Sequence, residues 1–444
     1  MIFLILFLSF LIRLIGINQS LWLDEAISAN VAKFPIGEII NHFSIGDFHP
    51  PMFYWFLNWW TKFFGSNVAV LRLSSVLFSL ITIYFVYLIG KKISLQNRVA
   101  NWATLFLAIN PLFVYYSQEL RMYSMATMWL IIGFYFFIKI KNNLSIPIKT
   151  RNYEVRDLVI FNLMMALAFG TFYGSIFLIA SLAIYWLIKK EWKLFWLTNI
   201  GTGIAIICLA PLLLIQIKNS QIMLMEVTNW SLVLGKVNLK NLLLIPLKFG
   251  VGKISFLPKT LYYLIGGGWS LILLGFILKK KKEFNWLKLF LILPIVLAIL
   301  FSIKSPLLQY FRFIYLVPIM CLVLAINTDK IWQKVLVGGG FLIFSLMYVL
   351  NPNYYREDWK SVTNNLSGNQ VYMIGSFGDP IKFYNPDIKI KDIKTELPTE
   401  KEIWAIPYGE AIHGMNIKEK LTNLGYKKIE EKNFREITLL RFSN

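Results

Sequence analysis

Acidic residues and cysteines are scarce in this sequence. Its 444 residues include 24 aspartates and glutamates against 45 lysines and arginines, and only two cysteines. Cys208 and Cys321 both lie inside apolar runs, so the sequence offers neither a disulfide framework nor a cysteine-rich metal site. Nucleotide-binding loops are lacking too: "GGGW" at 266–269 and "GGGF" at 338–341 lie at or inside apolar runs, where glycine favours close helix packing.

Long apolar runs are abundant instead. The chain is 57% hydrophobic and 16% charged, which is too apolar for a soluble globular protein of this length. Runs of about 17 residues or more are long enough to cross a bilayer as helices. We therefore predict an α-helical polytopic membrane protein whose first run is a retained span. The predicted transmembrane helices, about 11 in number, lie at 1–17, 68–90, 99–116, 122–139, 157–173, 174–188, 194–216, 260–278, 286–303, 306–326 and 331–350.

The basic residues favour one orientation in the membrane. They cluster at 91–98, 139–156, 189–193, 279–282 and 330–334. Cytoplasmic loops are enriched in lysine and arginine, and with the N-terminus cytoplasmic every cluster falls in a cytoplasmic loop. We expect a multi-pass protein of the plasma or inner membrane with an extracytoplasmic C-terminal region. The loops also account for the net charge of +21 without nucleic acid as a partner.

Two segments differ from the spans. The first outer loop, 18–67, contains "FPIGEIINHFS" and "PPMFYWFLNWWTKFFG", and its aromatic residues predict helices along the outer membrane surface. Residues 351–444 are more charged, with strand-like "QVYMIG", "EIWAIP" and "ITLLRF" alternating with helix-like "DPIKFYN" and "NIKEKLTNLG". We predict a transmembrane domain over 1–350 and a small extracytoplasmic α/β domain over 351–444.

Five polar stretches fall on the outer side under this topology. They contain Asp24 and Glu25 in "LWLDEAISAN", Asp47 and His49 in "DFHPPMFYW", Glu119, Arg121 and Tyr123 in "YYSQELRMYSM", Arg312 in "SPLLQYFRFIYLVP", and Arg356 and Asp358 in "YYREDWKSV". Taken singly, each has a structural interpretation, such as a helix cap or an ion pair between helix ends. Taken together, carboxylates and arginines at the outer membrane boundary suit a phosphate attached to a lipid.

The stretches "LDEA", "HPPMFYWFLNWWTKFFGSNVAVLRLSS" and "INPLFVYYSQELRMYS", in this order, resemble the GT-C membrane glycosyltransferases related to protein O-mannosyltransferases and lipid A aminoarabinose transferases. "YFRFIYLVP" and "REDWKSV" resemble the later half of the bacterial members, whereas 140–300 matches only as a hydropathy pattern. The resemblance implies a GT-C-type first outer loop within a catalytic 1–350 domain. It also implies a polyprenyl-phosphate-sugar donor in the membrane and transfer of the sugar, usually with inversion, to a hydroxyl of a lipid, glycan or protein acceptor.

The resemblance implies residue roles as well. An acidic residue in the first outer loop is essential in such families, and Asp24 matches it, so we assign Asp24 as general base. Glu25 would help place the acceptor or a cation. A lipid phosphate leaving group needs cationic clamping, for which Arg121 and Arg312 are the first candidates and Arg356 the third. The other predicted substrate-binding residues are His49, Glu119, Tyr123 and Asp358.

Three alternatives stay open. A divalent cation would find oxygen ligands and one nitrogen among Asp24, Asp47, His49 and Glu119. A transporter or flippase, or a ligase or polymerase, of lipid-linked glycans would use the same kind of substrate. A transporter, however, typically has paired halves and polar residues near the midplane, whereas the polar residues here gather toward one face. Residues 351–444 would either cap the outer cleft or select the acceptor.

Overall fold

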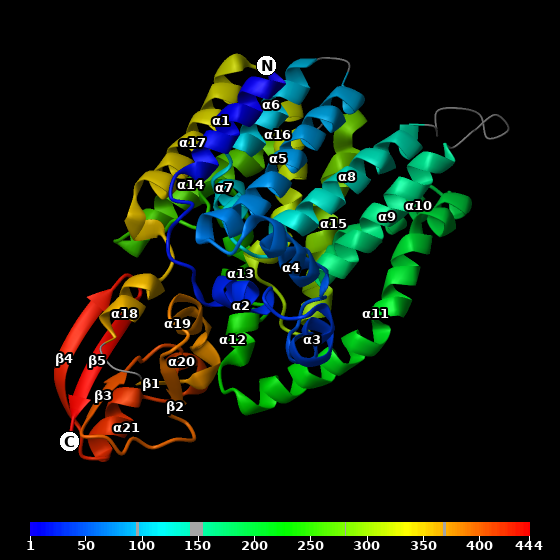
Figure 1. The fold of residues 1–444 in the computed structure, drawn as a ribbon. Coiled ribbons are helices and arrows are strands. Elements are labelled where there is room, and N and C mark those ends of the chain that lie inside the picture. Colours follow the sequence, from blue (N-terminus) through cyan, green and yellow to red (C-terminus); the bar gives the residue numbers. More distant parts are fainter. Residues whose placement is uncertain (95–96, 143–153, 280, 367–369) are drawn as a thin grey trace.

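The structure is a computed structural model that describes residues 1–94, 97–142, 154–279, 281–366 and 370–444 (Figure 1). Residues 143–153 and 280, which belong to two of the predicted basic clusters, lie outside the described part. The helical region contains α1 (Ile2–Leu14), α2 (Leu23–Val31), α3 (Ile36–Glu38), the π-helix η1 (Ile39–Ser44), α4 (Met52–Phe64), α5 (Val68–Ile93), α6 (Asn97–Ala108), α7 (Pro111–Ser117), α8 (Tyr123–Asn142), α9 (Val155–Thr171), the 3₁₀ helix η4 (Tyr173–Ser175), α10 (Ile176–Ile188), α11 (Trp192–Glu226), α12 (Trp230–Leu234), α13 (Leu239–Val251), α14 (Lys259–Leu278), η5 (Lys282–Phe284), α15 (Asn285–Ser302), η6 (Tyr310–Leu316), α16 (Val317–Asn327), α17 (Ile331–Leu350) and η7 (Pro352–Tyr354).

The predicted fold class is confirmed, but the predicted count of about 11 spans is not. Within the described residues, seven helices are long and apolar enough to cross a membrane: α5, α8, α11, α14, α15, η6 with α16, and α17. An eighth is obtained if α6 and α7, bent by 60° at the Asn110–Pro111 step, form one span. The remaining predicted spans fall on shorter helices: α1 has 13 residues, α9 has 17, and the turn η4 separates α9 from α10.

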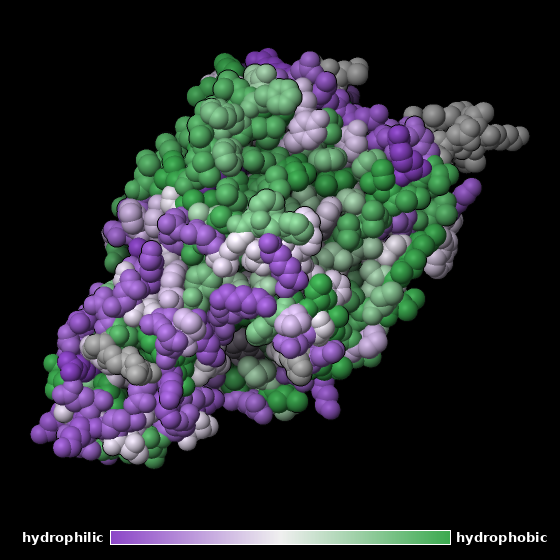
Figure 2. Space-filling model, in the orientation of Figure 1, coloured by the Kyte–Doolittle hydropathy of each residue, from purple (hydrophilic) through white to green (hydrophobic). Residues whose placement is uncertain are grey.

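Apolar side chains cover the outside of the helical body. Figure 2 shows a broad hydrophobic zone over the helices, with hydrophilic residues gathered on the C-terminal domain and at the opposite end. The long helix α11 is the most exposed of these apolar helices, because only 11% of its most apolar 18-residue segment is buried. It curves around the outside of the other helices and contains Pro211, which bends a helix by removing a hydrogen bond (Figure 1). An apolar helix exposed in this way requires lipid around it, as in a multi-pass membrane protein.

The C-terminal region forms a small α/β domain with its own core. Its elements are α18 (Trp359–Asn365), β1 (Gln370–Met373), η8 (Gly375–Phe377), α19 (Asp379–Tyr384), β2 (Lys389–Asp392), β3 (Glu402–Ala405), α20 (Glu410–His413), α21 (Ile417–Asn423), β4 (Lys427–Phe434) and β5 (Ile437–Ser443). The sheet has the order β2-β1-β3-β5-β4, with β1 parallel to both β2 and β3 and β5 antiparallel to both β3 and β4. The three predicted strands and two predicted helices are all present.

The C-terminal domain is held against the first outer loop. Asn30 in α2 donates to the backbone carbonyl and the carboxylate of Asp379 at the start of α19, both at 3.0 Å. The backbone N–H of Leu21 donates to the Tyr384 hydroxyl at 2.8 Å. Figure 1 shows α2, α3, α12 and this domain together at one end of the helical body, away from the N-terminus. The fold therefore collects the segments that carry the predicted polar residues.

Candidate active site

Asp24 and Arg121 meet at the beginning of α2. Asp24 lies in the first turn of the helix, where a negative charge is favoured by the helix dipole. Its carboxylate Oδ2 lies 3.6 Å from Nη2 of Arg121, which comes from the short loop between α7 and α8. The Arg121 side chain is 7% exposed and that of Asp24 is 35% exposed. The pair is thus loose, and its carboxylate remains open on one side.

The neighbouring Glu25 has a different environment. It is buried and accepts hydrogen bonds from Nε of Arg72 at 2.9 Å and from the backbone N–H of Leu120 at 2.8 Å. Its second oxygen pairs with Nη2 of Arg72 and accepts from the Trp22 N–H. Arg72 also donates to three backbone carbonyls in the turn 17–20. Glu25 is thus fully engaged inside the protein, and its predicted contact with the acceptor or a cation stays a prediction that competes with these bonds.

Polar groups from the first outer loop interact electrostatically with Arg121. Tyr54, which is buried in α4, donates its hydroxyl hydrogen to Oδ2 of Asp47 at 2.8 Å. Desolvation raises the pKa of Asp47, although the charge of Arg121 opposes this shift. Desolvation and the charges of Arg121 and Arg312 lower the pKa of His49 well below its usual value. His49 is therefore neutral at physiological pH and lies within electrostatic range of two guanidinium groups.

Arg312, in the 3₁₀ helix η6, is the second arginine that interacts electrostatically with His49. Its guanidinium carbon lies 5.8 Å from the centre of the Phe311 ring, and its Nη1 is buried without a hydrogen-bond partner in the described residues. The buried Tyr123 ring packs edge-on against Phe311 and Phe172, with 5.6 Å between ring centres in each case. His49 and Tyr123 thus each interact electrostatically with both Arg121 and Arg312.

Arg356 forms a second cationic position on the other side. Its Nη2 lies 3.2 Å from Oε1 of Glu119, and its guanidinium carbon lies 3.8 Å from the centre of the Trp22 ring. Burial raises the pKa of Glu119 to about 7, although the charge of Arg356 opposes this shift. Oε2 of Glu119 is buried and accepts no hydrogen bond from any described residue. Arg356 therefore already has a side-chain partner in Glu119, whereas Arg312 has no ion-pair partner among the described side chains.

Two predicted roles compete with interactions in the structure. Asp358 caps α18 by accepting from the N–H and the hydroxyl of Ser361, at 3.2 and 2.8 Å, so it supports a helix, and its substrate-binding role stays a prediction. The candidate metal ligands Asp24, Asp47, His49 and Glu119 are all described, yet no three His, Cys, Asp or Glu side chains of the described part gather closely enough to hold an ion. The residues present do not fit a divalent-cation site.

Several important residues were not predicted. Arg72 lies in the middle of an apolar stretch, where an arginine must find a partner, and this signal also marks Arg312. Tyr54 lies within an aromatic helix and has no distinctive local pattern. Glu357 and Tyr408 bring the C-terminal domain to the site: the Tyr408 hydroxyl donates to Oε1 of Glu357 at 2.9 Å and lies within electrostatic range of Asp24.

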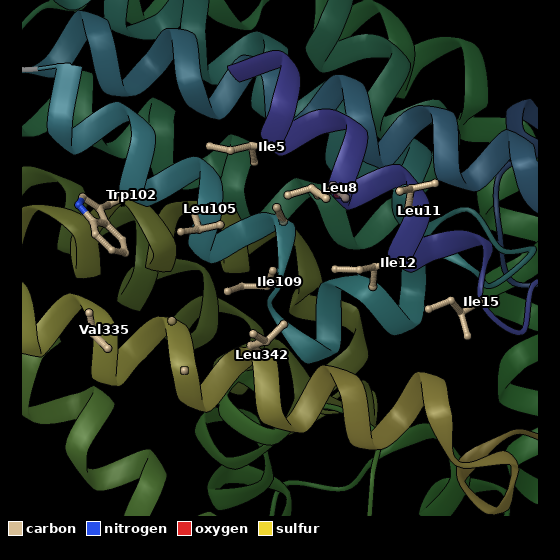
Figure 3. A pocket seen from close by; sticks show the side chains of 14 residues that line it. Ile5, Leu8, Leu11, Ile12, Ile15, Trp102, Leu105, Ile109, Val335 and Leu342 are labelled. Atoms are coloured by element: carbon tan, nitrogen blue, oxygen red, sulfur yellow. The ribbon is translucent and has the colours of Figure 1, made fainter. Parts of the chain in front are cut away.

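A large apolar groove lies apart from these polar residues. It has a volume of about 630 Å³ and runs between α1, α6 and α17 (Figure 3). Figure 3 shows Ile5 and Ile12 of α1, with Ile15 just after it, facing Leu105, Ile109 and Leu342 across the groove. Ser9 supplies the only hydroxyl group of its lining, and its oxygen already accepts a hydrogen bond from Arg13. The groove therefore has no group that would carry out chemistry on a substrate.

Comparison with known proteins supports the resemblance found in the sequence. Residues 48–215 match the family described as dolichyl-phosphate-mannose-protein mannosyltransferase. This segment contains His49, Tyr54, Arg72, Glu119 and Arg121, but begins after Asp24. No curated protein sequence matches the chain.

The whole fold is similar to that of two solved enzymes. ArnT from Cupriavidus metallidurans superimposes with a TM-score of 0.61 at 11% identity, over 99% of this chain and 97% of that one. Its structure bound to undecaprenyl phosphate gives a TM-score of 0.60. The Archaeoglobus fulgidus oligosaccharyltransferase gives 0.53 at 10% identity, over 88% of this chain and 64% of that one. The predicted likeness to GT-C glycosyltransferases is thus confirmed in the fold, and residues 48–215 carry the sequence pattern of the dolichyl-phosphate-mannose-protein mannosyltransferases.

Proposed function

We propose that this protein is a membrane glycosyltransferase that moves a sugar from a polyprenyl-phosphate donor to a hydroxyl group of a lipid, glycan or protein acceptor. The observation that carries the proposal is the loose Asp24–Arg121 pair, in which an open carboxylate lies 3.6 Å from a buried guanidinium. The fold supports the donor class, because the similar ArnT binds undecaprenyl phosphate and the similar oligosaccharyltransferase binds dolichol-phosphate. By the basic-loop pattern, the reaction takes place on the extracytoplasmic face.

Asp24 is the proposed general base. The acceptor hydroxyl transfers its proton to the Asp24 carboxylate as its oxygen bonds to the anomeric carbon of the donor sugar. The bond between that carbon and the phosphate oxygen breaks, and polyprenyl phosphate leaves with the electron pair. Attack from the face opposite the leaving group inverts the anomeric configuration. A positioned base contributes about 10²–10⁴-fold, and a nearby carboxylate also stabilises the oxocarbenium-like transition state.

Arg121 and Arg312 are the proposed phosphate clamp. A guanidinium group donates several parallel hydrogen bonds to a phosphate. The buried Nη1 of Arg312 donates to no described residue, so its hydrogens are available for such a bond. Neutral His49 adds one further N–H donor without repelling either arginine. Because the leaving phosphate remains an anion, its stabilisation by these three side chains replaces protonation by an acid.

The experiment uses the purified full-length protein in sealed vesicles supplied with labelled undecaprenyl-phosphate sugars. We expect release of undecaprenyl phosphate together with a new glycosidic bond, and a loss of about 10²–10⁴-fold in this rate in Asp24→Asn. Asp387→Asn, an exposed aspartate of the C-terminal domain, is the matched control and should retain the wild-type rate. A wild-type rate in Asp24→Asn would refute the base assignment.

The same vesicles test the competing functions. Label that crosses the membrane while remaining attached to its lipid would identify a transporter or flippase and overturn the proposal. Joining of lipid-linked glycans to one another would identify a polymerase or ligase.

A further inference from the structure

The C-terminal domain contributes a carboxylate with an unused hydrogen-bonding position. Glu357 is 7% exposed, and its Oε1 accepts from the Tyr408 hydroxyl at 2.9 Å. Its Oε2 is buried and has no hydrogen-bond partner in the described part of the chain. A buried carboxylate oxygen without a donor is costly, so a ligand that supplies one gains binding free energy there.

Tyr408 is fixed in place by aromatic neighbours. Its ring packs edge-on against Trp359 at 5.0 Å and against Phe377 at 5.5 Å between ring centres. Trp359 and Phe377 belong to the core of the C-terminal domain. The hydroxyl of Tyr408 lies within electrostatic range of Asp24, Glu357 and Arg356. The domain thus holds the Tyr408 hydroxyl in a fixed position from which it interacts electrostatically with Asp24, the proposed base.

Arg356 links this carboxylate to a second one. It pairs with Oε1 of Glu119 at 3.2 Å and lies within electrostatic range of Glu357 on its other side. Oε2 of Glu119 is also buried and unpartnered among the described residues. Arg356 thus ion-pairs with one carboxylate and interacts electrostatically with the other, and each carboxylate has one oxygen that accepts no hydrogen bond from a described residue.

We propose that Glu119, Glu357 and Tyr408 form the binding site for an uncharged, hydroxyl-rich acceptor such as the sugar portion of a glycolipid or glycan. This inference rests on the proposed glycosyltransferase function and extends it to the acceptor. Sugar hydroxyls are hydrogen-bond donors that suit free carboxylate oxygens next to a general base. An anionic acceptor would meet two carboxylates, and Arg356, the arginine that ion-pairs with Glu119, is already engaged, so such an acceptor is disfavoured.

The arginines and the carboxylates around Asp24 have separate proposed roles, the first in donor binding and the second in acceptor binding. Arg121 and Arg312 are in electrostatic range of His49 on the donor side, where a phosphate must be held. The carboxylates Glu119 and Glu357 are instead associated with Arg356 and Tyr408. The C-terminal domain is then a selector of the acceptor, which is the alternative to a passive cap.

Two acceptor probes that differ only in charge test the proposal. Full-length protein in nanodiscs is given labelled undecaprenyl-phosphate sugars and either octyl glucoside or octyl glucuronide, each below its micelle-forming concentration. We expect wild-type protein to prefer the neutral glucoside. In Glu357→Gln, which keeps an acceptor for Tyr408, this preference should fall about tenfold while the KM for the donor stays within about twofold. Tyr408→Phe should raise the KM for octyl glucoside.

Glu402→Gln is the matched control, because Glu402 lies in β3 of the same domain and pairs with Arg441 at the sheet. It should leave the preference unchanged. An unchanged preference in Glu357→Gln, a change in donor KM alone, or transfer to neither glycoside while undecaprenyl phosphate is released would overturn the acceptor site and leave the proposed function standing. Failure of the wild-type protein to release undecaprenyl phosphate from any donor would refute the proposed function itself.

Discussion

Asp24 and Glu25 are adjacent in sequence and have opposite surroundings. The Asp24 side chain is 35% exposed and 3.6 Å from its arginine, whereas that of Glu25 is 1% exposed and bonded to Arg72 through both oxygens. Consecutive helical residues point about 100° apart, so one acid faces the site and the other the interior. The comparison separates a pair that is available for chemistry from a pair that holds the loop in place.

The strongest test of this comparison is the removal of Glu25. Glu25→Gln leaves the Arg72 charge buried without a counter-charge, and breaking such a pair costs about 3–5 kcal/mol. We expect a large fall in the unfolding temperature, measured by thermal denaturation in detergent, whereas Asp24→Asn should unfold close to the wild-type temperature. The double variant Glu25→Met with Arg72→Met should recover part of the loss. A Glu25→Gln protein that is as stable as wild type would remove the distinction.

Replacement of an arginine of the proposed phosphate clamp should have the next largest effect. Arg312→Lys keeps the charge but loses the planar donor set, so we expect the KM for the donor to rise about tenfold. The unfolding temperature should change little, because Arg312 has no ion-pair partner among the described side chains. Lys304→Arg, an exposed residue between α15 and η6, is the control. An unchanged donor KM in Arg312→Lys would assign the clamp to other residues.

Glu119 should produce a pH effect on stability. Burial raises its pKa to about 7, above the value of about 4.3 for an unfolded glutamate. The folded state therefore binds more protons between these values, so the contribution of this group is complete below about pH 4 and is lost as the pH rises through about 7. Glu119→Gln should flatten the dependence of the unfolding temperature on pH between about 5 and 7. An equal slope in both proteins would contradict this assignment.

The smallest effect is expected at Asp358. Its carboxylate caps α18, and loss of such a cap costs about 1 kcal/mol. Asp358→Ala should lower the unfolding temperature slightly and leave both substrate KM values unchanged, while Asp358→Ser should restore the cap. A raised donor KM in Asp358→Ala would return this residue to the substrate-binding set.

The sequence was most informative where a physical rule links composition to position. Apolar length predicted the helices, and alternating strand-like and helix-like pieces predicted the C-terminal domain. Loop charge grouped Asp24 with Arg121 at one end of the molecule, and the structure brings their side chains into contact. The partner of Glu25 was not predicted, because the choice between Arg72 and Arg121 depends on the rotation of α2. Glu357 and Tyr408 follow Asp24 by more than 300 residues, and only the docking of α19 on α2 unites them.

The break between α6 and α7 makes the candidate site sensitive to changes in chain length. Asn110 caps α7 by accepting from the Phe113 N–H and also donates to the Phe249 carbonyl at 2.9 Å. Arg13 donates to the buried Ala108 carbonyl at the bend. These bonds anchor one end of α7, and Glu119 and Arg121 follow its other end. Because each residue turns a helix by about 100°, a single deletion in α7 would swing both side chains away from Asp24 and Arg356 together. The length of α7, seven residues, therefore sets the distance between the bend and the proposed catalytic and binding residues.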